Sequence, residues 1–187
     1  MDRQQVRDAK FPGGTWSMSE LVQIYRQYLF EDYLPFIERF VFDSKNGGFF
    51  CNCNYLGERL GESKRTWFDA RGAWVYANLY KYYSSDIKYI ERAKLTLTLL
   101  ENAKSNSQPY WPWTYDSLGK DLKEREGDIY GNLFVAEACI AYGSAINKSD
   151  YQLKGKLILL NAYHHIQQPN YRYKLDYAPD GSTKTVH

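Results

Sequence analysis

The sequence predicts an all-α protein in which helical hairpins repeat along the chain. Apolar residues recur at helical spacing in five stretches, and turn-forming stretches rich in Gly, Pro and Asn separate them. One of these patterns recurs 62 positions later. The 187 residues, 44% of them hydrophobic, are enough for one domain with a sizeable core. We therefore expect residues 1–187 to form a single domain.

The first predicted helix begins at a capping box, because Ser17 stands three residues before Glu20. Pro35 lacks a backbone N–H, and we expect it to kink or interrupt this helix near Leu34. The apolar residues of the helix are Leu21, Ile24, Tyr25, Tyr28 and Leu29.

Short hairpins are predicted between the helices. Asn46-Gly47-Gly48 ends any helix, and the alternating residues that follow suit a hairpin turning near Gly57. A second turn-and-hairpin stretch covers residues 105–124, and the tail after residue 168 has turn residues without a clear period. The remaining helices are predicted at about 66–83, 87–103, 129–146 and 151–168.

The repeat is clearest in the turns. "NYLGERLGE" at residues 54–62 falls on "DSLGKDLKE" at residues 116–124, and the aromatic strand before it and the helix after it also align. A unit of hairpin, helix, turn and helix, used at least twice, indicates a helical repeat array whose units must stack to bury their apolar faces. The alternative is a chance match between two turns.

The helix at 66–83 has two distinct faces. An aromatic face carries Trp67, Arg71, Trp74 and Asn78, spaced four, three and four apart. Ala70, Ala73 and Ala77 form a second face that permits close packing against another helix.

Arg71 has two interpretations. It is either an exposed arginine whose stem covers the tryptophans, or a cation aimed at a ligand oxygen in a concave pocket. Under the 62-residue shift Arg71 falls on Leu133, so the packing of the repeat does not require an arginine there.

Composition excludes several classes of protein. The net charge is +2 with no basic tract, so a nucleic-acid partner is not indicated. No apolar run reaches the roughly 18 residues of a membrane span, and the charged N-terminus lacks the apolar core of a signal peptide. Cys51 and Cys53 have no second Cys or His pair at metal-ligand spacing, so no metal site is expected. We expect reduced thiols and a cytoplasmic protein.

Three other groups of residues leave alternatives open. Asp116, with Glu124, could act as the carboxylate pair of a glycoside hydrolase, or it could be an ordinary turn residue. The aromatics of "YWPWTY", residues 110–115, suit either sugar stacking or a core strand. Glu137 is expected to have a structural role, through a hydrogen bond to a neighbouring helix end.

Three motifs in order resemble the N-acylglucosamine 2-epimerase family, which includes cellobiose 2-epimerases. "YLPFIERFVFDSKNGGFF" is similar to the family's opening helix and Gly-Gly-aromatic strand. "NYLGERLGESKRTWFDARGAW" is similar to its turn and Ala-Arg-x-x-Trp helix. "YDSLGKDLKEREGDIYGNLFVAEACIAYG" is similar to its second turn and fourth helix. The resemblance covers nearly all of the chain.

The resemblance implies an α/α toroid, a barrel of six helical hairpins with twelve helices in two rings. Residues 1–187 would then be its incomplete N-terminal half, about five helices with short β-hairpins. The implied reaction is proton transfer at C2 of a mono- or disaccharide, as an epimerase or an aldose–ketose isomerase, without a metal or redox cofactor.

The resemblance also implies roles for individual residues. Arg71 matches the active-site arginine that holds the sugar oxygen, and Tyr130, Trp67 and Trp74 are expected to line the sugar pocket. The family's two catalytic histidines belong to the second half of the barrel. His164, His165 and His187 match neither of them.

Removing a proton beside a carbonyl makes an enolate, which needs a base and a fixed cation. Arg71 could supply the cation, whereas no matched position supplies the base. The chain could instead be a non-catalytic fragment that binds sugar. Half of a barrel also leaves an apolar edge open, through which we expect a homo-oligomer or aggregation.

Overall fold

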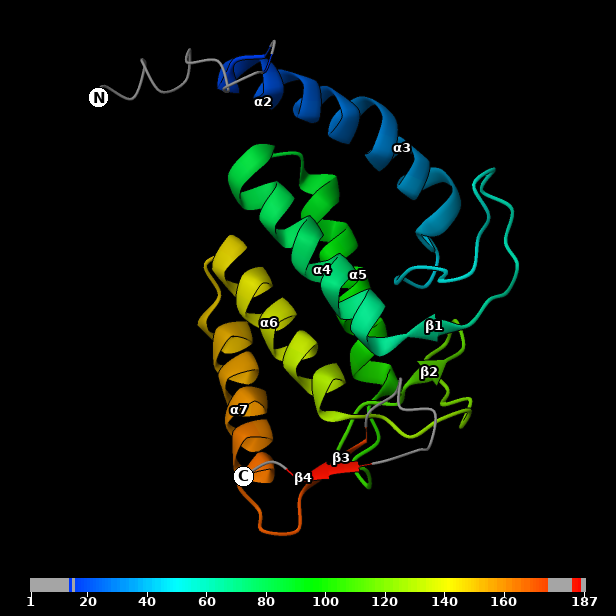
Figure 1. Ribbon diagram of the computed structural model, residues 1–187, viewed down its shortest axis with the longest axis vertical. Coiled ribbons are helices and arrows are strands. Elements are labelled where there is room, and N and C mark those ends of the chain that lie inside the picture. Colours follow the sequence, from blue (N-terminus) through cyan, green and yellow to red (C-terminus); the bar gives the residue numbers. More distant parts are fainter. Residues whose placement is uncertain (1–13, 15, 175–182, 186–187) are drawn as a thin grey trace. The chain divides into compact units, whose positions relative to one another are not determined.

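The computed structural model describes residues 14, 16–174 and 183–185 (Figure 1). This part of the chain is mostly helical, with five helices and two small two-stranded sheets. The all-α prediction is confirmed. Contacts divide the chain into two compact units, Met1–Phe42 with Cys53–Leu60 and Asp43–Asn52 with Gly61–His187. That residues 1–187 form a single domain stays a prediction.

One continuous helical segment makes up most of the described part of the first unit. It consists of α2 (Met18–Gln27), a π-helical turn at Tyr28–Tyr33, α3 (Leu34–Phe36) and a second π-helical turn at Ile37–Val41. The capping box is present, since Ser17 Oγ accepts from Glu20 N and Glu20 Oε2 accepts from Ser17 N.

The prediction for Pro35 is confirmed in part. α-Helical hydrogen bonding is interrupted on both sides of α3, but the helical backbone continues to Val41. Pro35 lies directly after a π-helical turn, so its missing N–H falls where the α-helical hydrogen-bond pattern is already interrupted. The wider π-helical turns accommodate the proline without ending the helix.

A tight turn completes the first unit. Asn54 O accepts from Gly57 N at 3.0 Å, and Asn54 Oδ1 accepts from the backbone N–H groups of Leu56 and Glu58. Gly57 has φ +83°, a conformation in which a side chain would be strained. Cys53 and Arg59 pair across this turn, which confirms the predicted hairpin.

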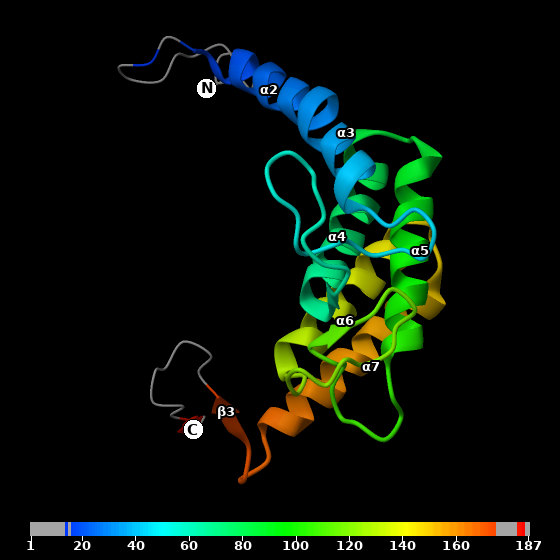
Figure 2. The ribbon, with the colours of Figure 1, turned by 90° about the vertical axis from the view of Figure 1, so that its right-hand side faces the viewer.

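The second unit contains two helical hairpins (Figure 1). α4 (Thr66–Asn78), extended by a π-helical turn at Leu79–Tyr83, packs against α5 (Ile87–Ala103). α6 (Ile129–Ala145) packs against α7 (Ser149–Ile166) and also lies beside α4, as both views show (Figure 2). The predicted helix bounds are confirmed to within two residues.

The structure also confirms the 62-residue repeat. Asp116 closes its turn as Asn54 does: its carbonyl accepts from Gly119 N, and its Oδ1 accepts from Leu118 N and Lys120 N. Gly119 has φ +90°, close to the value at Gly57. The same shift places α4 on α6 and α5 on α7, so the match between the turns is not a coincidence.

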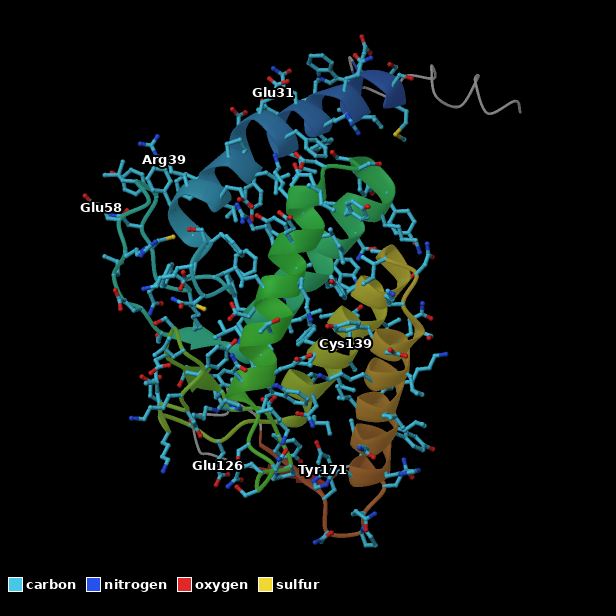
Figure 3. All side chains as sticks on the ribbon, turned by 180° about the vertical axis from the view of Figure 1, so that it is seen from behind. Glu31, Arg39, Glu58, Glu126, Cys139 and Tyr171 are labelled. Carbon is cyan, nitrogen blue, oxygen red and sulfur yellow. The ribbon has the colours of Figure 1, made fainter. Side chains whose placement is uncertain are left out.

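Small residues let the helices of the second unit approach closely. Ala70, Ala73 and Ala77 are fully buried, as expected for the packing face of α4. A Cβ on Gly155 of α7 would lie 2.5 Å from the carbonyl oxygen of Ala136 on α6. Cys139, labelled in Figure 3, is buried on α6.

Two short antiparallel ladders complete the second unit. β1 (Lys64–Arg65) pairs with β2 (Thr114–Tyr115), with Lys64 opposite Tyr115. β3 (Arg172–Lys174) pairs with β4 (Thr183–Thr185), so part of the tail is more regular than its sequence suggests. Within the described residues, no helix is long and apolar enough to cross a membrane.

Candidate functional site

A cluster of buried polar side chains lies where α4 begins. It comprises Asp43, Lys64, Asp69 and Tyr115, called here the polar cluster. Lys64 is fully buried, and its Nζ donates to Asp43 Oδ2 at 2.7 Å and to Gly47 O at 2.5 Å. Burial alone would raise the pKa of Asp43, but hydrogen bonds from Lys64 and Asn46 outweigh it and lower that pKa.

Asp69 joins α4 to two other segments of the second unit. Its Oδ1 accepts from Phe49 N at 2.7 Å, and its Oδ2 accepts from the hydroxyl of Tyr115 at 2.5 Å. The side chains of Asp69 and Tyr115 are fully buried. Burial raises the pKa of Asp69 to about 7, although the hydrogen bonds from Tyr115 and Phe49 oppose this rise. Burial and the charge of Asp69 raise the pKa of Tyr115 well above its usual value.

Arg71 lies one turn into α4 on an exposed surface. Its Cζ atom lies 5.9 Å from the ring centroid of Trp67 and 5.5 Å from that of Phe134 on α6. Such cation–π contacts hold a guanidinium in place without neutralising it. Arg71 has no hydrogen bond or ion pair with any other residue that the structure describes, so its N–H donors remain available to a ligand oxygen.

The aromatic face of α4 continues into a cavity shared with α6. Trp74 and Asn78 line this cavity, which has a volume of about 250 Å³. Lys81 closes one end, where its Nζ donates to Ser144 Oγ at 2.6 Å. The other lining residues are Tyr82, Glu137, Ile140 and Ala141. The cavity belongs to a shallow groove between α4 and α6, with Arg71 and Phe134 one turn before it.

The indole of Trp67 has an unused donor. Its Nε1 is buried and has no hydrogen-bond partner among the described residues. A buried N–H without an acceptor costs about 1–3 kcal/mol, so the placement of this indole is unfavourable in itself. Tyr130 is half-exposed in the first turn of α6 and lies four residues before Phe134, on the same helix face.

Asp116 has the geometry of a turn residue. Its backbone hydrogen bonds, first that from Lys120, lower its pKa, whereas a glycosidase acid needs a raised one. "YWPWTY" belongs largely to the core, because Trp111 and Tyr115 are buried and the Trp111 indole donates to Leu100 O. Glu137 is exposed, and the hydrogen bond expected for it to a neighbouring helix end is not found among the described residues.

The histidines of α7 do not line the α4–α6 groove. His165 packs its ring against Tyr110 and Tyr171, with centroids 5.3 and 5.5 Å apart, near the labelled Tyr171 in Figure 3. His164 is exposed, and His187 lies outside the described residues. Among the residues described, no group of three or more His, Cys, Asp or Glu could hold a metal ion.

Sequence reasoning missed Phe134, Lys81 and Ser144. In the sequence, Phe134 is one apolar residue in a helix that is apolar on all sides, so nothing distinguishes it. Lys81 reads as an ordinary solvated charge until its contact with Ser144 is seen. The packing of the two hairpins decides which face of α6 lies opposite Arg71. The periodic pattern within one helix contains no information about this packing.

Three solved structures are similar to this chain. A sugar epimerase from a ruminal bacterium matches with a TM-score of 0.64 and 20% identity, over 84% of this chain and 39% of that one. The cellobiose 2-epimerase from Bacillus thermoamylovorans B4167 matches with a TM-score of 0.67 and 19% identity, over 82% of this chain and 38% of that one. The cellobiose 2-epimerase from Spirochaeta thermophila DSM 6192 matches with a TM-score of 0.68 and 17% identity, over 89% of this chain and 44% of that one.

The chain has part of the sugar-epimerase fold. The predicted resemblance is confirmed at this level, including its partial extent, since the chain spans about two fifths of the length of these structures. The sequence matches no protein-family model and no curated protein. At 17–20% identity the comparisons establish the fold alone.

Proposed function

We propose that this chain supplies part of the sugar site of an epimerase or isomerase that transfers a proton at C2 of a mono- or disaccharide. The observation that carries the proposal is the state of Arg71. Its guanidinium is stacked on Trp67 and Phe134, exposed, and unpaired among the described residues. A fixed cation on an aromatic surface suits a neutral sugar, which presents both oxygens and an apolar ring face.

The proposed role of Arg71 follows from the chemistry. Proton abstraction next to a carbonyl places negative charge on the carbonyl oxygen, and a preorganised donor stabilises that charge as it develops. Arginine stays protonated at any working pH, so it can donate to the oxyanion throughout the reaction. Trp67, Trp74 and Tyr130 would hold the sugar ring against the groove. The proton itself must be moved by a base, for which we assign no residue of this chain.

The first experiment measures binding by calorimetry with cellobiose, mannose and N-acetylglucosamine in turn. Replacing Arg71→Met should weaken binding of the preferred sugar about tenfold or more, because a charge-assisted hydrogen bond is lost. Arg125→Met is the matched control, since Arg125 also stacks on a tryptophan, Trp113 at 4.0 Å, but does not line the groove. Absence of binding by all three sugars, or equal losses in the two variants, would contradict the proposal.

The second experiment separates catalysis from binding. The chain is incubated with the bound sugar in deuterium oxide, and deuterium at C2 is followed by NMR. Exchange that is lost in Arg71→Met supports proton transfer by this chain. Binding without exchange supports the alternative, a sugar-binding part that lacks the base.

We further propose that α7 is the surface through which the chain meets a second copy. Its exposed apolar residues are Leu153, Leu157, Leu159, Leu160 and Tyr163. The repeat supports this assignment: Leu97 of α5 is 1% exposed, whereas Leu159 at the equivalent position of α7 is 45% exposed. A face that is covered in one hairpin is open in the other.

A further inference from the structure

Two charged side chains at the start of α4 have no charged counterpart in the repeat. Under the 62-residue shift, Asp69 falls on Gly131 and Arg71 on Leu133. α6 nevertheless forms an equivalent helix and packs against the same kinds of neighbours. Hairpin packing therefore requires neither the buried carboxylate nor the guanidinium. Both charged residues lie in the same turn of helix, two positions apart.

We propose that Asp69 is a positioning residue, which holds the first turn of α4 so that Trp67 and Arg71 meet the sugar in a fixed geometry. This inference rests on the proposed sugar site. Trp67 lies two residues before Asp69 and Arg71 two residues after it, so any rotation of this turn moves both side chains. Asp69 itself is fully buried and does not reach the groove.

The hydrogen bonds of Asp69 fix the turn from two directions. Oδ1 accepts from Phe49 N in the segment that follows the two glycines, and Oδ2 accepts from Tyr115 on β2. Gly48 leaves the space for this carboxylate, since a Cβ there would lie 2.4 Å from Asp69 Oδ2. The carboxylate is thus held by two segments that are remote from each other in sequence and cannot shift without losing a hydrogen bond.

The protonation state of Asp69 should affect this connection. The ionisable groups around it are Lys64 on β1, Asp43 and Cys51 in the preceding segment, and Tyr115 on β2. Because burial raises its pKa to about 7, Asp69 changes charge near neutral pH. The ionised carboxylate accepts from both donors, whereas the protonated one has one oxygen that must donate. The hydrogen bonds that hold the first turn of α4 should therefore differ below and above neutral pH.

The test uses the 187-residue chain labelled with 5-fluorotryptophan. The chain has five tryptophans, and the fluorine resonance that disappears in Trp67→Phe belongs to Trp67. In the unmodified chain this resonance should shift between pH 5 and 9 with a midpoint near 7. In Asp69→Asn, which keeps the size of the side chain, it should not titrate over this range.

Two further variants distinguish positioning from a general loss of structure. Tyr115→Phe keeps the carboxylate but removes a hydrogen bond that lowers its pKa, so the midpoint should move above 7. Asp86→Asn is the control, because Asp86 is an exposed N-cap of α5, and asparagine caps equally well. The Trp67 titration should be unchanged in this control. A Trp67 resonance that ignores both pH and Asp69→Asn would overturn the proposal.

Sugar binding provides the last measurement. At pH 8, Asp69→Asn should bind the preferred sugar about fivefold more weakly than the unmodified chain, since a loosened site must be ordered on binding. Asp86→Asn should bind within about twofold of it. If the unmodified chain binds no sugar, the proposed function fails, while the fluorine titration still decides whether Asp69 positions Trp67. Unchanged affinity in Asp69→Asn would overturn the positioning role for sugar.

Discussion

The hydroxyl of Tyr115 donates to Asp69 Oδ2 at 2.5 Å, although 46 residues separate the two in the chain. This contact joins β2 to α4 within the polar cluster. Both partners are fully buried, so the charge of Asp69 is kept away from water.

Stability should depend on pH through Asp69. Its pKa is about 7 in the folded chain and about 3.8 when unfolded, so between these values only the folded state holds the proton. The free energy of unfolding therefore falls as pH rises from about 4 to 7 and is level above. Urea unfolding at several pH values should show this fall in the unmodified chain and its loss in Asp69→Asn. An equal fall of the free energy of unfolding with pH in both proteins would show that Asp69 does not cause the pH dependence.

Lys64→Met should be strongly destabilising. It leaves Asp43 as a buried charge without its partner, which typically costs about 3–5 kcal/mol. Lys154→Met is the matched control, since its ion pair with Glu101 has the same length, 2.7 Å, but is exposed and worth less than about 1 kcal/mol. Urea unfolding at pH 7 measures both. Adding Asp43→Asn to Lys64→Met should recover part of the loss, and no recovery would mean that the buried charge was not its cause.

Gly48→Ala should also destabilise the second unit. Gly48 has φ +76°, and a Cβ would collide with the Asp69 carboxylate, so we expect a loss of about 2 kcal/mol or more. At Gly61 a Cβ would approach nothing closer than Asn52 Nδ2 at 3.4 Å. Gly61→Ala should therefore change stability by about 0.5 kcal/mol or less. Thermal unfolding compares the two variants, and equal effects would exclude the close approach to Asp69 as the reason.

Association of the chain should depend on α7. Sedimentation velocity across a range of concentrations should show a dimer or larger species in the unmodified chain, and Leu157→Glu with Leu160→Glu should shift it toward monomer. The control is Leu118→Glu, since Leu118 is still more exposed but lies in a turn. A chain that is monomeric at every concentration, or a control with the same effect, would argue against α7 as the interface.

Much of the fold could be predicted because its determinants are local. The capping box at Ser17, the turn glycines and the alanine face of α4 each act through neighbours in sequence, and all three are found as expected. The repeat added the pairing of hairpins, since equivalent sequences must occupy equivalent places. The π-helical turns around Pro35 were not predicted, because the local rule for proline does not say how a helix will adjust.

The candidate site was predictable only in part. The aromatic face of α4 identified Arg71 and its stacking on Trp67, both of which are intrahelical. The other half of the stacking, Phe134, comes from a different hairpin. The polar cluster was not foreseen either: Lys64 and Asp69 read as ordinary charges until the fold brings Asp43 and Tyr115 to them.

The duplicated hairpins differ in how tightly their sequences are constrained. α6 has a glycine and a leucine where α4 has a buried acid and a cation, Asp69 and Arg71. When a hairpin is duplicated, one copy can keep the residues that packing requires. The other copy can then gain substitutions that packing and stability do not require. The pair of helices is in this sense an internal comparison, because α6 shows that the same architecture forms without an acid or a cation at these two positions.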